Sequence, residues 1–260
     1  MFILTKDYRS IFNLSGKVAL ITGAAGSIGG EYARALAQNG VHLALLDLRQ
    51  EKLGQLKASL SEYGVRVETF PCDLKDISEI KATVAKVIEV FERIDILLNH
   101  AGLNIRKPAL EYSAQEWSDI VDVNARGAFF MAQQVGNYMV ARMGGKIINT
   151  ASVSAVRGHP NLSIYAITKG GIAQMTKVLA IEWARYNINV NAIAPGYIIT
   201  EQTGGFLKDE KVYNSILSKI PSGRIGQPAD LVGAMLFLCS GASDYLTGQT
   251  ILVDGGRTID

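Results

Sequence analysis

The sequence has few cysteines and histidines, and their scarcity excludes several kinds of site. Cys72 and Cys239 are the only cysteines among 260 residues, and each lies in an apolar stretch. We expect both to be core thiols without a disulfide, as in proteins of a reducing compartment. The three histidines, at positions 42, 100 and 159, are too scattered for a metal-binding motif. The sequence therefore predicts a cytoplasmic protein without a metal site.

An excess of one charge and long apolar runs are also lacking. The chain carries 26 Lys and Arg against 24 Asp and Glu, a formal net charge of +2. This balance, without runs of like charge, argues against a nucleic acid as partner. The apolar start Met1–Leu4 is interrupted by Lys6, Asp7 and Arg9. We therefore expect neither a secretory signal nor a membrane span.

What the sequence does contain is an alternation of short apolar runs and longer helical patterns. With 48% hydrophobic residues, the chain can bury a full core. Apolar strands separated by helices predict a parallel sheet that is covered on both faces. No linker or repeat divides the chain, so we expect one doubly wound, Rossmann-type α/β domain over residues 1–260. The predicted strands are Val18–Thr22, Val41–Asp47, Val65–Cys72, Ile94–Asn99, Lys146–Asn149, Ile188–Ile193 and Gln249–Val253. The predicted helices are Ile28–Asn39, Gln50–Glu62, Ile77–Phe91, Ala114–Met143 (in one or two pieces), Ser163–Tyr186 and Leu231–Ser240.

One long segment, residues 197–224, follows neither pattern. It contains glycines and is only weakly periodic. Long irregular segments in compact domains are commonly functional. We therefore expect a mobile lid over a substrate site.

A glycine-containing turn joins the first predicted strand to the first predicted helix. It reads Thr22-Gly-Ala-Ala-Gly-Ser-Ile-Gly29. Such glycines let backbone N–H groups approach a pyrophosphate at the positive end of a helix. An ordinary tight turn is the alternative, but the placement between strand and helix favours dinucleotide binding. The candidate contacts are Gly23, Gly26, Ser27, Ile28 and Gly29.

Two acidic residues follow neighbouring predicted strands. Asp47 is placed to accept hydrogen bonds from the adenosine ribose hydroxyls and to repel a 2′-phosphate. The glycine turn contains no Lys or Arg, which also favours NAD over NADP, whereas Arg49 is a weak indication of NADP. Asp73 has two equal interpretations, as a contact to the adenine or as a cap for the following helix.

Three further residues form a candidate catalytic group. Tyr165 and Lys169 are one helical turn apart, and Ser152 lies thirteen residues before the tyrosine. A nearby ammonium favours a phenolate, so we expect Lys169 to lower the pKa of Tyr165 from its usual value of about 10. Such a tyrosine can exchange a proton with an alcohol at neutral pH. A solvated helix face is the alternative, and the position after a nucleotide-binding half favours catalysis.

In this order and spacing, the motifs resemble those of the short-chain dehydrogenase/reductase family. The resemblance extends from Leu14 to Asp254 and includes the ending Thr247–Gly256. It implies a seven-stranded Rossmann-type fold, NAD(P) as cofactor and usually a homotetramer. Further cofactor contacts that it implies are Asp73, Leu74, Asn99, Ala101, Gly102, Pro195, Gly196, Ile198 and Thr200.

The resemblance also implies roles for individual residues. Tyr165 is the acid/base, and Ser152 orients the carbonyl of the substrate. Lys169 holds the nicotinamide ribose, and Asn124 supports a water that relays protons. Thr200, with the backbone of Ile198, binds the carboxamide.

Two residues depart from the family pattern. Ser27 occupies the position of the middle loop glycine, which changes the close approach to phosphate, although a serine hydroxyl can itself bond phosphate. His100 stands where the family more often has asparagine. We expect this histidine to be a neutral hydrogen-bonding substitute.

The candidate substrate residues are polar. A polar site suits a polyol, a sugar or a sugar acid, because an apolar substrate would leave buried polar groups unpaired at roughly 1–3 kcal/mol each. Arg106 or Arg157 can pair a carboxylate in bidentate fashion, and a surface or oligomer contact is the alternative for each. The candidates are Asn104, Arg106, Ser154, Arg157, His159, Asn161 and residues 201–206.

Two long helical segments, Ala125–Met143 and Ser163–Tyr186, are richer in apolar and small residues than one buried face requires. The family pairs these helices across a dimer interface, so we expect a homo-oligomer, with intramolecular packing as the alternative. The leading hypothesis is an NAD-dependent polyol or sugar-acid dehydrogenase. The alternatives are an NADPH-dependent 3-oxoacyl-(acyl-carrier-protein) reductase and a non-enzymatic, nucleotide-binding regulatory subunit.

Overall fold

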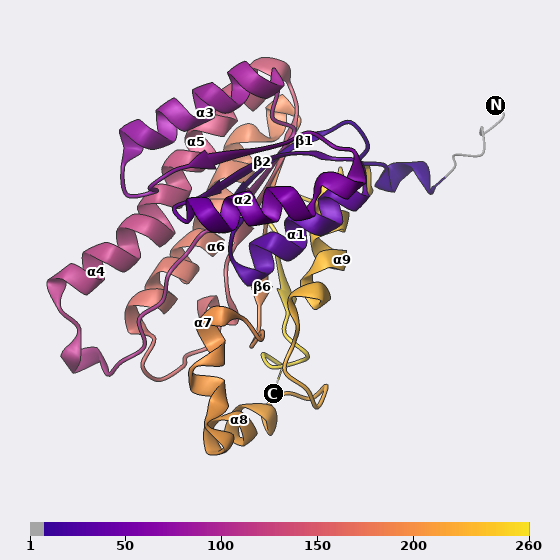
Figure 1. Ribbon diagram of the computed structural model, residues 1–260. Helices are drawn as coiled ribbons and strands as arrows, with labels where there is room; N and C mark the ends of the chain where they lie inside the picture. The colour runs from indigo at the N-terminus through magenta and orange to yellow at the C-terminus, as the bar shows by residue number, and fades with distance from the viewer. Residues whose placement is uncertain (1–7, 260) are drawn as a thin grey trace.

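Seven apolar runs form one parallel sheet in the computed structural model, which describes residues 8–259 apart from the side chain of Phe206 (Figure 1). The strand order is β3-β2-β1-β4-β5-β6-β7, which is that of a doubly wound fold, so the predicted fold class is confirmed. The predicted apolar start Met1–Leu4 lies outside the described residues. The strands are β1 Val18–Thr22, β2 His42–Asp47, β3 Val67–Pro71, β4 Ile96–Asn99, β5 Gly145–Thr150, β6 Ile188–Pro195 and β7 Thr250–Val253.

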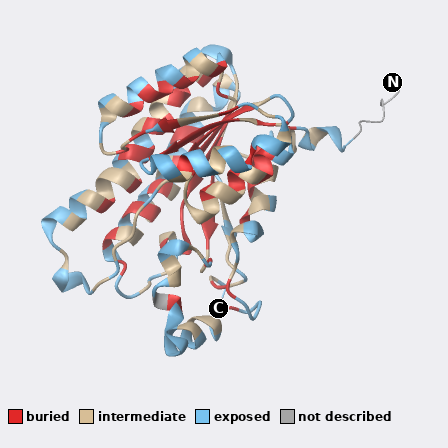
Figure 2. Ribbon diagram, in the orientation of Figure 1, coloured by how far each residue is buried: buried red, intermediate tan, exposed pale blue. Residues whose placement is uncertain are grey.

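Successive residues of each central strand point to opposite faces of the sheet. In β1, Ala19 and Ile21 belong to one buried cluster, whereas Val18 and Leu20 belong to the other. Both faces of β1 are buried, which explains why the strand is apolar throughout rather than alternating. Figure 2 shows the buried sheet between helices whose outer faces are exposed.

Helices cover each face of the sheet. On one face lie α1 (Ser27–Gln38), α2 (Gln50–Ser59) and α9 (Val232–Cys239), whose apolar residues join the first cluster. On the other face lie α3 (Ile77–Phe91), α5 (Ala128–Arg142) and α6 (Ser163–Trp183). Figure 1 shows these two layers on either side of the strands.

The predicted helix over residues 114–143 is divided in the structure. It consists of α4 (Ala114–Val121), a π-helical turn η4 (Asp122–Gly127) and α5. The side chain of Ser113 starts α4 by accepting a hydrogen bond from the N–H of Glu116, while the Glu116 carboxylate accepts one from the N–H of Ser113. Short π-helical turns are frequent at functional sites, and this one carries Asn124.

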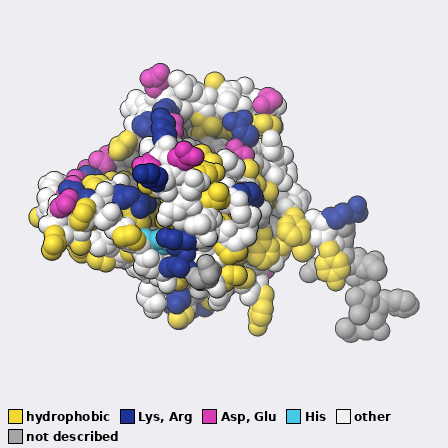
Figure 3. Space-filling view, turned by 90° about the horizontal axis from the view of Figure 1, so that it is seen from below, with side chains coloured by type: hydrophobic (Ala, Val, Ile, Leu, Met, Phe, Trp, Pro, Cys, Tyr) yellow, Lys and Arg dark blue, Asp and Glu magenta, His cyan; other side chains and the backbone are white. Residues whose placement is uncertain are grey.

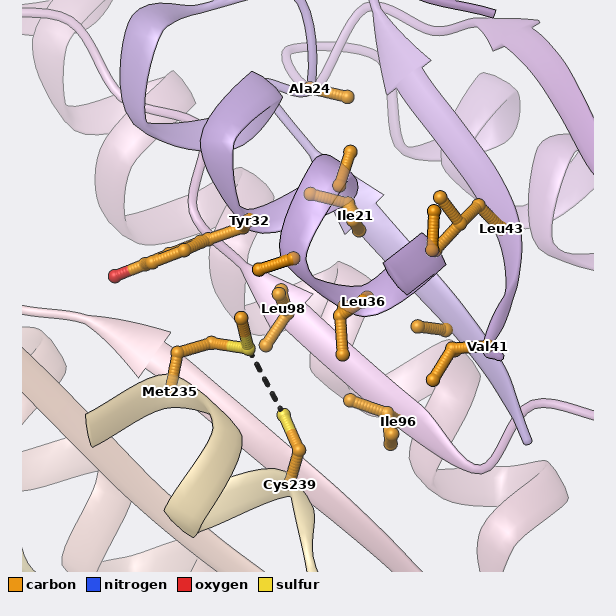
Figure 4. Close-up of a cluster of buried hydrophobic side chains, with 14 of the residues drawn as sticks. Ile21, Ala24, Tyr32, Leu36, Val41, Leu43, Ile96, Leu98, Met235 and Cys239 are labelled. Atoms are coloured by element: carbon orange, nitrogen blue, oxygen red, sulfur yellow. Dashed lines mark hydrogen bonds between the residues drawn. The ribbon is translucent and has the colours of Figure 1, made fainter. Parts of the chain in front are cut away.

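The first cluster includes one of the two cysteines. The Cys239 thiol lies 3.6 Å from the sulfur of Met235. Figure 4 shows both in the cluster that also contains Leu98 and Ile96 of β4. Burial raises the pKa of Cys239 to about 12, and burial also raises that of Cys72 to about 11. Both cysteines are free and buried, so the prediction of core thiols is confirmed.

The segment that follows β6 contains helices that the weak periodicity did not reveal. They are α7 (Glu201–Gly204), η7 (Phe206–Lys208) and α8 (Glu210–Leu217). Thr200 caps the first of these helices and Asp209 caps the last. Leu207, Ile220 and Ile225 form a small apolar cluster of their own beneath them. Residues 197–224, for which a lid stays a prediction, lie below the sheet in Figure 1, and we refer to them as the lid.

Candidate active site

A deep cleft lies at the carboxyl ends of the strands, where the strand order reverses between β1 and β4; we call it the main cleft. It has a volume of about 650 Å³, the size of a cofactor site. The predicted residues that line it are Gly23, Gly26, Ser27, Ile28, Asp47, Asp73, Leu74, Ala101, Gly102, Ser152, Tyr165, Lys169, Pro195, Gly196, Ile198 and Thr200. Glu201, Gln202 and Thr203 of the lid close its lower side.

The glycine turn has no room for side chains at two of its positions. A Cβ atom on Gly29 would lie 2.3 Å from the carbonyl oxygen of Gly23. At Gly23, φ is +68°, and a Cβ atom would lie 2.9 Å from Cα of Ala101. The turn therefore brings bare backbone to the start of α1, the arrangement that binds phosphate groups. Gly29 itself packs within the turn and does not line the cleft.

Ser27 is the first residue of α1, and Gly26 is the residue before the helix. The Ser27 hydroxyl accepts a hydrogen bond of 3.2 Å from the backbone N–H of Glu201. The residue that departs from the family pattern thus connects the glycine turn with the lid.

Asp47, at the end of β2, is held by several donors. The backbone N–H of Ala25 lies 3.1 Å from one oxygen, and the Arg49 guanidinium binds both oxygens at 3.0 and 3.1 Å. Burial alone would raise the pKa of Asp47, but the hydrogen bonds and charge of Arg49 outweigh it and hold this pKa below its usual value. Asp47 is therefore an anion at neutral pH.

Asp73 does not cap the helix that follows. Asp76 does so, because its carboxylate accepts from the N–H groups of Ser78 and Glu79. Asp73 instead accepts a hydrogen bond of 2.9 Å from the N–H of Lys75 and lines the cleft. The cap interpretation of Asp73 is wrong, and the contact to the adenine stays a prediction.

Ser152, Tyr165 and Lys169 meet at the inner end of this cleft. Ser152 follows β5, while Tyr165 and Lys169 lie on successive turns of α6. The Tyr165 hydroxyl is hydrogen-bonded to the Ser152 side chain, and the Ser152 hydroxyl also accepts from the N–H of Ser154 at 3.1 Å. The Lys169 ammonium lies 5.6 Å from the centre of the Tyr165 ring.

The expected acidic tyrosine is not found. Burial raises the pKa of Tyr165 above its usual value, and the hydrogen bond from Ser152 and the charge of Arg106 only partly oppose it. The Lys169 ammonium donates instead to the carbonyl oxygen of Thr150 at 2.7 Å. Burial lowers the pKa of Lys169 to about 8. The prediction that Lys169 makes the phenol acidic is therefore wrong, because the cost of burying a phenolate dominates.

Asn124 is buried in the π-helical turn. Its amide oxygen accepts from the N–H of Leu103 at 2.8 Å, and its amide nitrogen donates to the Leu103 carbonyl at 2.8 Å. A weaker bond reaches Thr168 at 3.3 Å. The side chain thus fixes the loop after β4 against α6.

His100 is half-buried and lines the main cleft together with Lys169. Its Nδ1 lies 3.0 Å from the hydroxyl of Thr150, and its ring meets that of Tyr32 edge to face. Burial, with the charge of Lys169, lowers the pKa of His100 to about 4. The histidine is neutral at physiological pH, as expected for a hydrogen-bonding substitute.

A second, smaller pocket of about 90 Å³ shares Ser152 and Tyr165 with the main cleft. Arg106, Asn104 and His159 line it, together with Ser154 and lid residues. Among the described residues, the buried Oδ1 of Asn104 and Nε2 of His159 have no hydrogen-bond partner. Burial lowers the pKa of His159, and the charges of Arg257, Arg106 and Arg157 lower it further.

Three predicted residues lie elsewhere. Asn99 is buried, and its amide bonds the carbonyl of Ala128 and the side chain of Asn149. Asn161 lies in an exposed left-handed turn with φ +65°, and Arg157 donates to the backbone of Arg257. Gln202 and Thr203, within the predicted range 201–206, line both pockets, whereas sequence analysis missed Arg257 near His159, since no motif marks it.

Figure 3 views the end of the molecule at which the lid lies. A histidine lies directly beside dark blue Lys and Arg side chains near the middle of this face, and acidic side chains adjoin other basic ones. Within residues 8–259, no group of three or more His, Cys, Asp or Glu can hold a metal ion. No helix of this part of the chain is long and apolar enough to cross a membrane.

This fold and cleft are those of a nucleotide-binding oxidoreductase, and the comparisons with known proteins agree. A family model described as enoyl-(acyl carrier protein) reductase matches residues 23–258. The chain is 42% identical over 250 residues to 2-dehydro-3-deoxy-D-gluconate 5-dehydrogenase of Escherichia coli, covering 95% of this chain and 97% of that one. It is 38% identical over 246 residues to a 3-oxoacyl-(acyl-carrier-protein) reductase of Thermotoga maritima, covering 95% and 99%.

A solved structure of a dehydrogenase is also similar to this chain. A gluconate 5-dehydrogenase of Burkholderia cenocepacia, in complex with NADP and tartrate, superimposes with a TM-score of 0.93 at 37% identity, covering 96% of this chain and 98% of that one. The chain belongs to the short-chain dehydrogenase/reductase family. It is an oxidoreductase that acts on hydroxyl or keto groups with a nicotinamide cofactor.

Proposed function

We propose that this enzyme interconverts a secondary alcohol and a ketone on a sugar acid, with Ser152, Tyr165, Lys169 and Asn124 as its catalytic group. The observation that carries the proposal is the small pocket beside Ser152 and Tyr165. Arg106 brings a positive charge, while Asn104 and His159 bring buried polar atoms without partners among the described residues. A hydroxylated carboxylate supplies both an anion for Arg106 and hydroxyl groups for the polar atoms.

The main cleft suits a nicotinamide dinucleotide. A Cβ atom at Gly23 or Gly29 would clash with the backbone, so the glycine turn offers backbone N–H groups rather than side chains to a phosphate. When bound, the cofactor supplies or takes up a hydride. Asp47 would accept hydrogen bonds from the adenosine ribose, and its charge favours NAD over NADP. Arg49 beside it supports NADP as a weaker second choice.

The raised pKa of Tyr165 defines its part in the reaction. At neutral pH the phenol is protonated, so it donates a hydrogen bond to the carbonyl oxygen of a ketone, and Ser152 donates another. As negative charge develops on this oxygen, Tyr165 gives up its proton. Lys169, on the same helix face, holds the nicotinamide ribose and supplies a proton to replace it. Asn124 keeps Leu103 in place beside this group.

The substrate class is tested with Arg106→Met. Reduction of 5-keto-D-gluconate is compared with reduction of an uncharged keto-sugar, each with NADH and NADPH. Loss of the guanidinium should raise KM for the acid by about tenfold or more and leave the uncharged substrate within about twofold. Equal effects on both substrates, or no turnover of any sugar acid by the unaltered enzyme, would refute the sugar-acid assignment.

Reduction of acyl-carrier-protein substrates is the second candidate, supported by the Thermotoga maritima relative. Turnover of an acetoacetyl thioester with NADPH that exceeds turnover of every sugar acid would favour it. A nucleotide-binding regulatory subunit is the third candidate, and it requires that no substrate of the panel is turned over.

We also propose that the enzyme is a cytoplasmic homotetramer and that the lid moves over the substrate. Phe129 of α5 and Val178 and Ile181 of α6 are exposed apolar residues, which supports pairing of these helices between subunits. Measurement of the molecular mass by light scattering tests the oligomeric state.

The apolar cluster of the lid is separate from the clusters of the sheet, which supports movement of the lid as a unit.

A further inference from the structure

A charged cluster joins the lid to the nucleotide edge of the sheet. Both oxygens of Glu201, the first residue of α7, accept from the Lys52 ammonium, at 2.9 and 2.8 Å. The same carboxylate lies 3.6 Å from the Arg49 guanidinium. Lys52 and Arg49 come from the start of α2 and the residue before it, about 150 positions earlier in the chain. Glu201 therefore spans the mouth of the main cleft, which both Arg49 and Glu201 line.

The cluster balances charge around the adenosine end of this cleft. Arg49 lies between two carboxylates, because it binds Asp47 on one side and approaches Glu201 on the other. Two cations, Arg49 and Lys52, thus face two anions. The Lys52 hydrogen bond and the charges of Lys52 and Arg49 lower the pKa of Glu201, so it is an anion at neutral pH.

We propose that Glu201 is a specificity-determining residue, whose carboxylate occupies the two cations that would otherwise bind the 2′-phosphate of NADP. This inference rests on the proposed function only in placing a nicotinamide dinucleotide in the main cleft. Asp47 marks where the adenosine ribose is held, and Arg49, which binds Asp47, is next to it. A phosphate there would compete with Glu201 for Arg49 and Lys52 and would be repelled by Glu201 itself. NAD carries no charge at this position, so Glu201 acts on NADP alone.

Lys52 is the cation that Glu201 holds most directly. Its ammonium reaches Glu201 with good geometry and is not engaged by Asp47. Removal of Glu201 would therefore leave Lys52 available to a phosphate, while Arg49 keeps its bonds to Asp47. The side chains are partly exposed, 43% for Lys52 and 64% for Glu201, so water and salt weaken the effect.

Equilibrium binding of NADPH and NADH, measured by nucleotide fluorescence without substrate, tests the proposal. We expect Glu201→Gln to tighten NADPH binding by about five- to tenfold, the size of one partly screened charge interaction. Binding of NADH should stay within about twofold. Lys52→Met should weaken NADPH binding and, combined with Glu201→Gln, should remove most of the gain. The matched control is Glu210→Gln, which removes a carboxylate from α8 of the same lid.

Salt provides a second arm of the test. The gain in NADPH affinity should shrink between about 20 mM and 500 mM NaCl, because the Debye length falls from about 20 Å to less than 5 Å. Equal changes in both cofactors would show that Glu201 only closes the lid, and no change would show that it has no influence. Either result overturns the proposal. If the unaltered enzyme binds neither cofactor, the proposed function fails as well, which separates the two failures.

Discussion

The glycine turn and the lid face each other across one cleft, but they are held in place by different forces. The turn is fixed by backbone contacts, since Gly23 and Gly29 have no space for a Cβ atom. The lid is attached by the bridge between Ile198 and Gly226, by hydrogen bonds from Ser222 to Gly255 and from Glu201 to Ser27, and by partly exposed ion pairs of Glu201 and Arg224. Its glycines, Gly204, Gly205 and Gly223, have open space around them. The shape of the glycine turn is therefore determined by steric contacts, whereas the position of the lid depends on a few hydrogen bonds and on ion pairs that solvent screens.

The largest effect is expected at the junction of the two regions, where Tyr165 lies. Tyr165→Phe should reduce turnover by about 10²–10⁴-fold, because the Ser152 hydroxyl can still donate a hydrogen bond to the substrate oxygen but is not the proposed proton donor. Melting temperature and cofactor binding should remain near those of the unaltered enzyme, since both the turn and the lid are intact. Steady-state kinetics and fluorescence titration measure these quantities. Near-normal turnover would contradict the assigned role.

The next largest effects are expected from truncating apolar side chains in the core of the sheet and in the small cluster of the lid. Leu98→Ala removes a fully buried side chain of β4 and should lower the free energy of unfolding by about 2–5 kcal/mol. Ile220→Ala, in the small apolar cluster of the lid, should cost less global stability and raise KM for the substrate instead. Denaturant titration and kinetics on both variants separate the outcomes. Equal losses of stability would mean that lid and sheet unfold as one unit.

Alanine substitution at a glycine of the turn and at a glycine of the lid should have smaller effects on stability. Gly29→Ala places a methyl group against the Gly23 carbonyl and should destabilise the fold by about 1–3 kcal/mol while weakening cofactor binding. Gly204→Ala adds the same methyl group in open space within α7 and should change the free energy of unfolding by less than about 1 kcal/mol. Thermal melting and cofactor titration check both. Tolerance of Gly29→Ala would mean that the turn is softer than its contacts indicate.

The sheet and its cleft were predictable from sequence for a physical reason. A strand such as β1 is buried on both faces and must be apolar, and its glycine turn must avoid Cβ atoms, so both leave patterns in the sequence. The helices of the lid leave little pattern, because each is short and packs on a small cluster. The pKa of Tyr165 was mispredicted because the i, i+4 spacing reports proximity to Lys169 but not how deeply both are buried. Arg257 was missed because its position near His159 depends on the end of the chain folding back.

The smallest effect concerns His100, which supports the rigid side of the cleft. Its pKa is about 4 in the folded protein, against the ordinary value of 6.5. Between these values the unfolded chain binds a proton that the folded protein does not, so stability falls as pH drops from 6.5 towards 4. His100→Asn removes this dependence. From pH 6.5 to 5.5, the unaltered protein should lose about 1 kcal/mol more than the variant, as measured by denaturant titration. Parallel curves for the two proteins would mean that His100 can be charged in the folded state, and that desolvation of its ring is weaker than a pKa of about 4 requires.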